Sequence, residues 1–502
     1  MKTLTSILIF FAFVVELRAQ NVYNLPASNI FLGNNMFAFA SGVPIRTIPT
    51  TNVGGYRSIS DNTGNLLFYT GNSYPYLGNT DKIYTKNHQI MPNGNNLDLK
   101  GLIGGVAILP MGDNKYFVFC AKYGVRDSLA YTVVDMNLNN GLGAVTQRNR
   151  GFYDTSSPNS PVISSLSVVK HGNGRDWWLI GVEWYPDFTT HPLKMIKYLV
   201  TPSGVAAVPS TQVFANILKE PYGFMFSSFS PDGTKYFASG VHGQAHLFNF
   251  DRCSGVFSLV ADLSLAPLQP NNGYSIGLFS YSGNALYISD ARLNSIYQFD
   301  LNSANIVGSK TLVLHNPEDD PTGPNYGRYH LESWYIHPDK KMYIYNIGGS
   351  NNTPTGAFIL DSINTKASVI QNPDGIGTAC NLTYNSFNMN CAINNNGDTG
   401  ITPHHINYDL GVVEASVCDS LFGVGVVALP ARTSGLAVRS LGGGQYVVGF
   451  GAGTAELRLT DATGNELRRF ACTGTEQLID LSSYAQGIYF LRSGTGVVKL
   501  VR

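Results

Sequence analysis

Charged residues are scarce in this sequence, and the deficit excludes several classes of protein. They make up 13% of the 502 residues, about half of the usual share in soluble proteins. Lys and Arg balance Asp and Glu at 33 each, so no net positive field would attract nucleic acid. After residue 20, no apolar run is long enough to cross a bilayer. We therefore expect no nucleic-acid partner and no transmembrane segment in the mature chain.

Recognisable catalytic and metal-binding motifs are missing as well. The six cysteines show no CxxC pair and no Cys/His spacing of a zinc site. There is no G-x-S-x-G elbow, HExxH helix or phosphate-binding loop. The sequence therefore predicts no catalytic residue and a protein that is not an enzyme. Cys380 and Cys391 are close enough in the chain to bridge neighbouring strands, but two unpaired buried thiols explain them equally well.

The first 20 residues, MKTLTSILIFFAFVVELRAQ, have the pattern of a secretory signal. A basic residue, Lys2, precedes an apolar run, and Leu17-Arg18-Ala19 offers a small-residue cleavage site. We predict a signal peptide over residues 1–19. The mature protein is then exported, either to the cell surface or to the extracellular medium.

A hairpin pattern recurs along the next part of the chain. FSPDGTKYFASG at 229–240 has relatives in ISDNTGNLLFYT at 59–70 and FSYSGNALYISD at 279–290, and six copies occur in all. Each copy is an apolar strand, a turn of Gly, Asp or Asn, and a second strand rich in aromatic residues. A third and a fourth strand usually follow, so the period is about 50 to 60 residues, which is typical of propeller blades.

This repeat predicts an all-β fold with a β-propeller over residues 20–411. A four-stranded sheet has two apolar faces, and packing such sheets around an axis covers both. We expect the strands of 30–45 and 378–390 to join as a mixed last blade, which makes seven blades; six and eight are the alternatives. We predict a linker over 412–430. The alternating runs of 431–502 then indicate a small antiparallel β-sandwich.

The C-terminal residues resemble the sorting domain of the type IX secretion system of Gram-negative bacteria. The resemblance rests on Asp461 to Asn465, on IDLSSYAQGIYFLR at 479–492 and on Lys499, within about the last 70 residues. The Asn-Pro motif that usually begins this domain is absent. The stretch of 54–94 is similar to exported bacterial propeller proteins that often carry the same tail. These resemblances imply that the type IX machinery is a partner, and they assign a sorting role to Asp461, Gly464, Asp480, Leu481, Gly487, Tyr489 and Lys499.

Three loops between the expected strands carry aromatic residues that would gather at one rim of a propeller. Aromatic rings beside Asn, Asp and Arg suit the binding of a sugar or peptide, although they also pack as lids over blade edges. The predicted ligand-binding residues are Tyr74, Tyr76, Trp184, Tyr185, Phe188, Tyr326 and Arg328.

One acidic loop is a candidate metal site. Glu318, Asp319 and Asp320 are consecutive carboxylates that could supply oxygen ligands to calcium. A solvated loop is the alternative, and no other cofactor is expected. We predict an exported binding protein for a glycan, a peptide or a surface partner. The alternative is a propeller hydrolase or lyase with a metal in its central channel.

Overall fold

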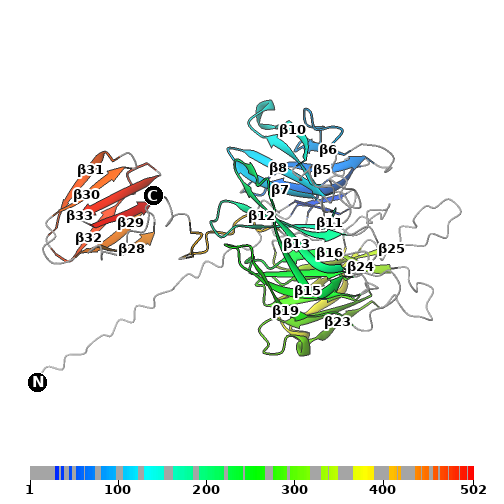
Figure 1. Ribbon diagram of the computed structural model, residues 1–502. Coiled ribbons are helices and arrows are strands. Elements are labelled where there is room, and N and C mark those ends of the chain that lie inside the picture. The colour runs from blue at the N-terminus through cyan, green and yellow to red at the C-terminus, as the bar shows by residue number, and fades with distance from the viewer. Residues whose placement is uncertain are drawn as a thin grey trace, which may run out of the picture. The chain divides into compact units, whose positions relative to one another are not determined.

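The computed structural model contains two compact units, residues 1–422 and residues 423–502 (Figure 1). The structure describes residues 29–501 with gaps. The longer gaps are 39–44, 48–52, 74–80, 98–105, 122–128, 152–161, 185–190, 266–274, 317–328, 349–365, 389–405, 420–435 and 451–455, and one to four residues are missing at several other points. The predicted signal peptide lies outside the described residues.

Within the described residues every long element is a strand, so the all-β prediction is confirmed. The described strands of unit 1 form seven antiparallel sheets, each made of strands consecutive in the chain. The first three sheets contain β1 (Asn29–Leu32), β2 (Asn35–Ala38) and β3 (Ile45–Thr47); β4 (Val53–Ser60), β5 (Leu66–Ser73) and β6 (Lys82–Thr85); and β7 (Val106–Gly112), β8 (Lys115–Ala121), β9 (Leu129–Asp135) and β10 (Ala144–Gly151).

The remaining four sheets of unit 1 follow in chain order. They contain β11 (Val162–Lys170), β12 (Trp177–Trp184), β13 (His191–Thr201), β14 (Gly204–Val205) and β15 (Ser210–Lys219); β16 (Phe224–Phe229), β17 (Lys235–Gly240), β18 (Ala245–Phe250) and β19 (Phe257–Asp262); β20 (Gly277–Phe279), β21 (Ala285–Ser289), β22 (Ser295–Asp300) and β23 (Thr311–His315); and β24 (Tyr329–Ile336), β25 (Met342–Gly348), β26 (Lys366–Ile370) and β27 (Leu382–Asn388). Short 3-10 turns occur at Asn139–Gly141, Val307–Ser309 and Gly377–Cys380.

The first strands of successive sheets lie beside one another, in the order β4, β7, β11, β16 and β20. Adjacent sheets share apolar clusters: one joins Phe237 and Leu247 of the fifth sheet to Leu286 and Phe299 of the sixth. Sheets packed face to face with their first strands inward are the arrangement of a β-propeller. The propeller prediction is therefore supported by the packing of unit 1.

The predicted mixed blade is wrong. β27, which covers most of 378–390, pairs with β26, and β1 pairs with β2 instead of with the end of the repeat region. Consecutive strands need only a short loop to pair, so local pairing costs less chain entropy than joining segments more than 300 residues apart.

The strands of unit 2 form two antiparallel sheets that share one apolar cluster, which includes Val448, Leu459, Ile479 and Leu491. One sheet contains β28 (Leu436–Gly442), β29 (Gln445–Phe450) and β32 (Glu476–Asp480). The other has the order β31 (Glu466–Ala471), β30 (Glu456–Asp461), β33 (Ile488–Ser493) and β34 (Gly496–Val501).

The same hairpin turn occurs in both units, because its geometry is fixed locally. In DNTGN, Asp61 Oδ1 accepts the backbone N–H groups of Thr63 and Asn65, both at 2.9 Å. In DATGN, Asp461 Oδ1 accepts the N–H of Asn465 at 2.9 Å. A glycine stands at the fourth position of each turn with φ near +90°, at 87° and 90°, a conformation that only glycine adopts readily.

Hydrogen bonds lower the pKa of the Asp61 carboxyl group. Burial opposes its charged form, but bonds from the side chains and backbones of Thr63 and Asn65 outweigh this and lower the pKa of Asp61 to about 2.

We expect Asp61→Ala to destabilise unit 1 by about 1 kcal/mol at neutral pH, because the turn loses its charged acceptor. A carboxyl with a lowered pKa stabilises the fold fully above its unfolded pKa of about 4, and the contribution is lost as the pH falls through about 2. Denaturant unfolding at pH values between neutral and 2 measures this. Asp61→Asn, which keeps the acceptor without the charge, is the control. If Asp61→Ala lost the same stability relative to the wild type at neutral pH and at pH 2, the assignment would be wrong.

Candidate functional site

Residues 406–419, which we call the strap, pack against the third sheet of unit 1 and cross hairpin turns of the fourth and fifth sheets. Tyr408 Oη donates to Ile108 O of β7 at 2.8 Å. The N–H of Val413 donates to Gly172 O in the turn between β11 and β12 at 2.7 Å. Asn407 Nδ2 donates to Pro231 O in the turn between β16 and β17 at 2.8 Å. The strap therefore holds three neighbouring sheets together at the side where their first and second strands connect, which we call the turn rim.

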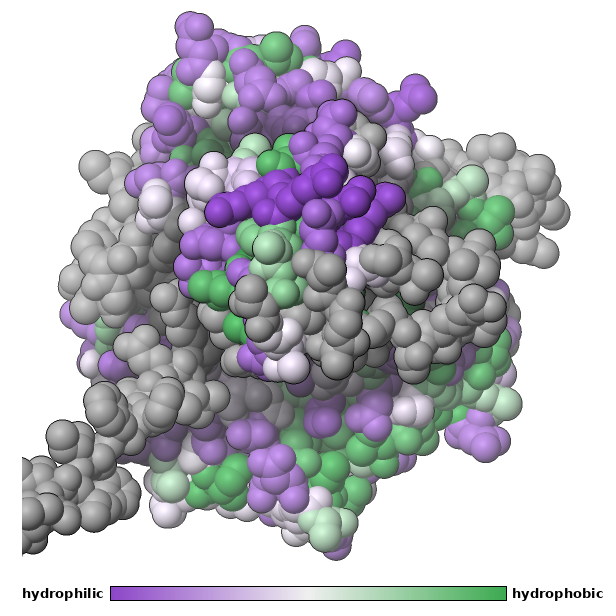
Figure 2. Space-filling model, turned by 90° about the vertical axis from the view of Figure 1, so that its left-hand side faces the viewer, coloured by the Kyte–Doolittle hydropathy of each residue, from purple (hydrophilic) through white to green (hydrophobic). Residues whose placement is uncertain are grey.

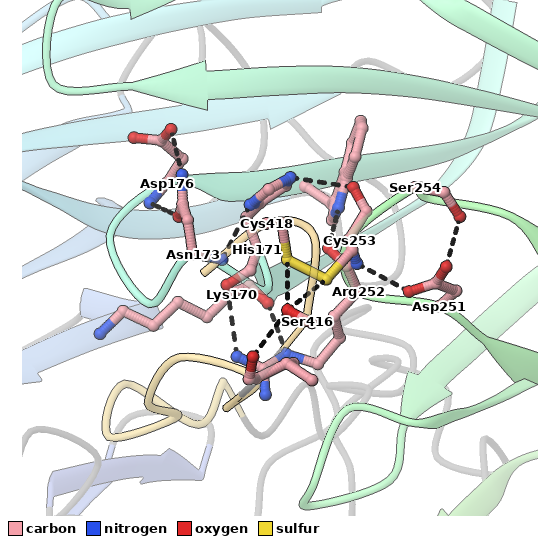
Figure 3. The surroundings of a disulfide bond; sticks show 12 residues. Lys170, His171, Asn173, Asp176, Asp251, Arg252, Cys253, Ser254, Ser416 and Cys418 are labelled. Carbon is pink, nitrogen blue, oxygen red and sulfur yellow. Dashed lines mark hydrogen bonds between the residues drawn. A yellow bond between two sulfur atoms is a disulfide. The ribbon is translucent and has the colours of Figure 1, made fainter. Parts of the chain in front are cut away.

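A disulfide bond fixes the end of the strap. Cys418 is joined to Cys253 in the turn between β18 and β19, and the two cysteines are 165 residues apart in the sequence (Figure 3). The sequence left the cysteine pairing open. Cys380 is a buried thiol in the structure, whereas Cys391 lies outside the described residues.

Arg252, next to the disulfide, bonds three backbone carbonyls in two separate segments. Its Nε donates to Lys170 O at 2.8 Å, and its Nη2 donates to Gly411 O at 2.7 Å and His171 O at 3.3 Å (Figure 3). Burial lowers the pKa of Arg252, and the charge of Asp232 opposes that effect, but a guanidinium stays protonated in proteins. One buried cation thus ties the strap to two turns.

His171 and Trp178 complete the contact between the turns. Trp178 Nε1 donates to Arg252 O at 2.8 Å, and the two rings lie 5.3 Å apart between centroids. Asn173 N donates to His171 Nδ1 at 3.0 Å, which leaves the proton on Nε2, 3.0 Å from Cys253 O. The imidazole therefore bonds within its own turn through Nδ1 and reaches the turn between β18 and β19 through Nε2.

Glycine allows the close approach of the strap. Gly174 has φ +70°, and a Cβ there would lie 2.7 Å from the backbone nitrogen of Val412. No residue with a side chain fits without moving the strap. The turn rim of these sheets is thus occupied by the protein's own chain.

The opposite side, which we call the loop rim, carries polar pairs at the strand ends. Glu183, near the end of β12, is 6% exposed, and its Oε1 lies 3.1 Å from Lys194 Nζ of β13. In the next sheet, His246 Nδ1 lies 3.6 Å from Asp262 Oδ1. Burial lowers the pKa of His246, and Asp262 opposes that shift.

The sixth sheet has a polar pair at the corresponding position. Ser295 Oγ and His315 Nδ1 are 2.9 Å apart. They are direct cross-strand neighbours, as are His246 and Asp262, and each pair joins a third strand to a fourth. Half-buried polar groups at corresponding ends of adjacent sheets can orient a polar ligand that lies across them.

The predicted ligand-binding residues belong to loops whose strand ends lie at the loop rim. β5 ends at Ser73 and β12 at Trp184, both at the end of a second strand, and residues 316–328 join β23 to β24. The side chain of Trp184 and residues Tyr74, Tyr76, Tyr185, Phe188, Tyr326 and Arg328 lie outside the described residues.

The calcium ligands predicted at Glu318, Asp319 and Asp320 also lie outside the described residues, so the site stays a prediction. Among the residues that the structure does describe, no three His, Cys, Asp or Glu side chains are grouped closely enough to hold a metal ion. The same part of the chain contains no helix with the length and apolarity that crossing a membrane requires.

The predicted sorting residues support the fold of unit 2. Asp461 and Gly464 form the turn described above. Asp480 Oδ1 accepts the N–H of Ser482 at 2.8 Å, and Leu481 is fully buried. Tyr489 Oη donates to Ala485 O at 2.6 Å. Gly487 immediately precedes β33, and Lys499 lies in β34 with its side chain outside the described set.

Sequence reasoning missed the strap, although a signal was present. Ile406, Tyr408 and Leu410 alternate with polar residues, and they pack into the apolar clusters of neighbouring sheets. An alternation of this kind indicates an extended segment with one buried face. Residues 412–419, within the predicted linker, are bonded to unit 1 by the disulfide.

No family model and no curated protein matches the chain. Among solved structures, the Dos1 propeller is similar with a TM-score of 0.44 and 12% identity, covering 74% of this chain and 83% of that one. A putative 6-phosphogluconolactonase from Bacteroides uniformis has a TM-score of 0.39 and 15% identity, covering 65% of this chain and 90% of that one. A luciferin-regenerating enzyme has a TM-score of 0.35 and 11% identity, covering 61% of this chain and 87% of that one.

These comparisons correct one expectation. The prediction that the protein is not an enzyme does not stand, because structures with a similar arrangement include proteins titled as a lactonase and as a luciferin-regenerating enzyme. At identities this low, these activities belong to those proteins alone.

We expect Cys253→Ser, Cys418→Ser or both together to destabilise unit 1 by about 3 to 4 kcal/mol, because the bond closes a long loop in the unfolded chain. Hydrogen exchange of residues 406–419 should rise more than that of the sheets. Cys472→Ser, which removes a thiol in unit 2, is the control. An unchanged exchange rate in the strap would show that hydrogen bonds alone hold it.

Proposed function

We propose that the protein is an exported, seven-bladed β-propeller that binds a glycan, a peptide or a surface protein at its loop rim. Each sheet of unit 1 is one blade in this proposal, and unit 2 is a β-sandwich that acts as the sorting domain. The observation that carries the binding site is the strap, because it covers the turn rim of these blades and so favours the loop rim as the binding side.

The chemistry of the loop rim supports this choice. A buried carboxylate, Glu183, with its Lys194 partner lies beside the loop that contains Tyr185 and Phe188. Aromatic side chains bury apolar area at a low cost in entropy, and neighbouring charged groups orient a polar ligand. Binding and turnover occur on the same fold, so this proposal concerns the site and not the fate of the ligand.

Features at both ends of the chain support the proposal that the protein is exported. The N-terminal segment has the pattern of a signal peptide, and unit 2 is a compact β unit that begins at residue 423. The resemblance of its last 70 residues or so to a type IX sorting domain supports delivery to the cell surface or the medium.

The binding proposal predicts that Trp184→Ala, Tyr185→Ala and Phe188→Ala together weaken binding at least tenfold, since each buried aromatic contributes about 1 kcal/mol or more. Immobilised glycan and peptide arrays identify the ligand, and titration with the best array hit measures the loss. Leu312→Ala, which shortens an exposed side chain on the outer strand β23, should bind like the wild type. Equal binding by the triple variant would refute the site.

The export proposal predicts that deleting residues 423–502 retains the protein in the periplasm of a host that has the type IX machinery. Immunoblots of periplasm, outer membrane and medium measure the distribution, with the full chain as the reference. Cleavage of residues 1–19 from the retained protein shows that the first export step still works. If the protein without residues 423–502 still reached the medium, unit 2 would not be the sorting domain.

A further inference from the structure

Three arginines form a row across the exposed face of the second sheet of unit 2. Arg469 of β31 is the direct cross-strand partner of Arg458 of β30, and Arg458 is the partner of Arg492 of β33. All three side chains are exposed. Adjacent strands are about 4.8 Å apart, so the guanidinium groups lie close together. Figure 2 shows strongly hydrophilic side chains gathered on the side where Figure 1 draws β30 and β31.

Carboxylates offset only part of this positive charge. Glu456 Oε1 lies 2.6 Å from Arg458 Nε and 3.6 Å from Arg469 Nη1, and Glu466 pairs with Arg469. Arg492 has no carboxylate within ion-pair distance among the described residues. Like charges directly opposite one another destabilise a sheet, and an anionic partner would remove that cost.

Unit 2 concentrates positive charge although the chain as a whole is neutral. Residues 423–502 contain eight Lys and Arg against five Asp and Glu, whereas the whole chain has 33 of each. The strand of Arg492 also contributes apolar side chains to the same face, since Ile488 and Phe490 lie four and two residues before it and are only partly buried. The face therefore combines guanidinium groups with an aliphatic and an aromatic side chain.

We propose that this arginine face binds the phosphate headgroups of an anionic lipid surface. The planar guanidinium fork fits phosphate oxygens in pairs, which a lysine does not do. The cations cross three strands and the apolar side chains extend along one of them, so the patch spreads in two dimensions and fits a surface better than a single peptide. Phenylalanine beside arginine suits the boundary between headgroups and acyl chains.

The test is sedimentation of the protein with vesicles of phosphatidylcholine that contain phosphatidylglycerol. The protein lacks residues 1–19, so that the apolar N-terminal segment does not itself bind lipid, and it retains every described residue. Each arginine near an anionic surface adds about 1 kcal/mol, so Arg492→Ser should lower the partition coefficient about fivefold. The Arg458→Ser, Arg469→Ser, Arg492→Ser triple variant should lower it about 100-fold. Added salt should weaken wild-type binding.

Arg468→Ser is the matched control, because Arg468 neighbours Arg469 in β31, is exposed, and lies 5.1 Å from the ring centroid of Phe470 instead of in the row. It removes the same charge and should change the partition coefficient much less than Arg492→Ser. Circular dichroism confirms that each variant is folded. The proposal fails if wild-type protein binds neutral vesicles equally well, or if Arg468→Ser matches Arg492→Ser. Displacement by polyglutamate but not by inositol hexakisphosphate would also overturn it, in favour of an acidic protein partner.

Discussion

The structure of unit 1 depends on sheets whose described strands are buried on both faces. All five residues of β21 are buried, and five of the six in β17 are. A strand of this kind cannot turn one face to water, so each sheet needs a neighbour on either side. The shared apolar clusters supply these neighbours: one joins the third sheet to the fourth, another the fifth to the sixth, and a third the sixth to the seventh. The position of every loop follows from this stacking, because the strands of each sheet run back and forth between the same two rims.

Much of this arrangement could be predicted from the sequence, because the residues within a hairpin turn set its geometry. Ser230, Asp232 and Gly233 form the turn of FSPDGTKY through bonds within six residues: Ser230 Oγ donates to Asp232 Oδ1 at 2.6 Å, and Gly233 N donates to Ser230 O at 2.8 Å. The DNTGN and DATGN turns form in two different units and share the bonds between their Asp and Asn residues. Where the geometry depends on a few neighbouring residues, the sequence predicts it reliably.

Features that join distant segments could not be predicted in the same way. The pairing of β27 depends on which strand is free beside it, and the choice of Cys253 and Cys418 is one of many pairings that six cysteines allow. The arginine row needs the register of three strands, since Arg458, Arg469 and Arg492 are not adjacent in any linear motif. The aromatic loops differ from both cases: the ends of the flanking strands locate them, but their side chains lie outside the described residues.

The site of the disulfide gives the chain between the units a mechanical property. Cys418 lies just before the boundary at residues 422 and 423, so a force that pulls on unit 2 reaches unit 1 through a covalent bond to the β18–β19 turn. The hydrogen bonds of Asn407, Tyr408 and Val413 are upstream of that bond, so the disulfide is the covalent path that bypasses them. A protein tethered by its C-terminal unit in flowing liquid would thus keep its propeller intact until a sheet, and not the strap, yields.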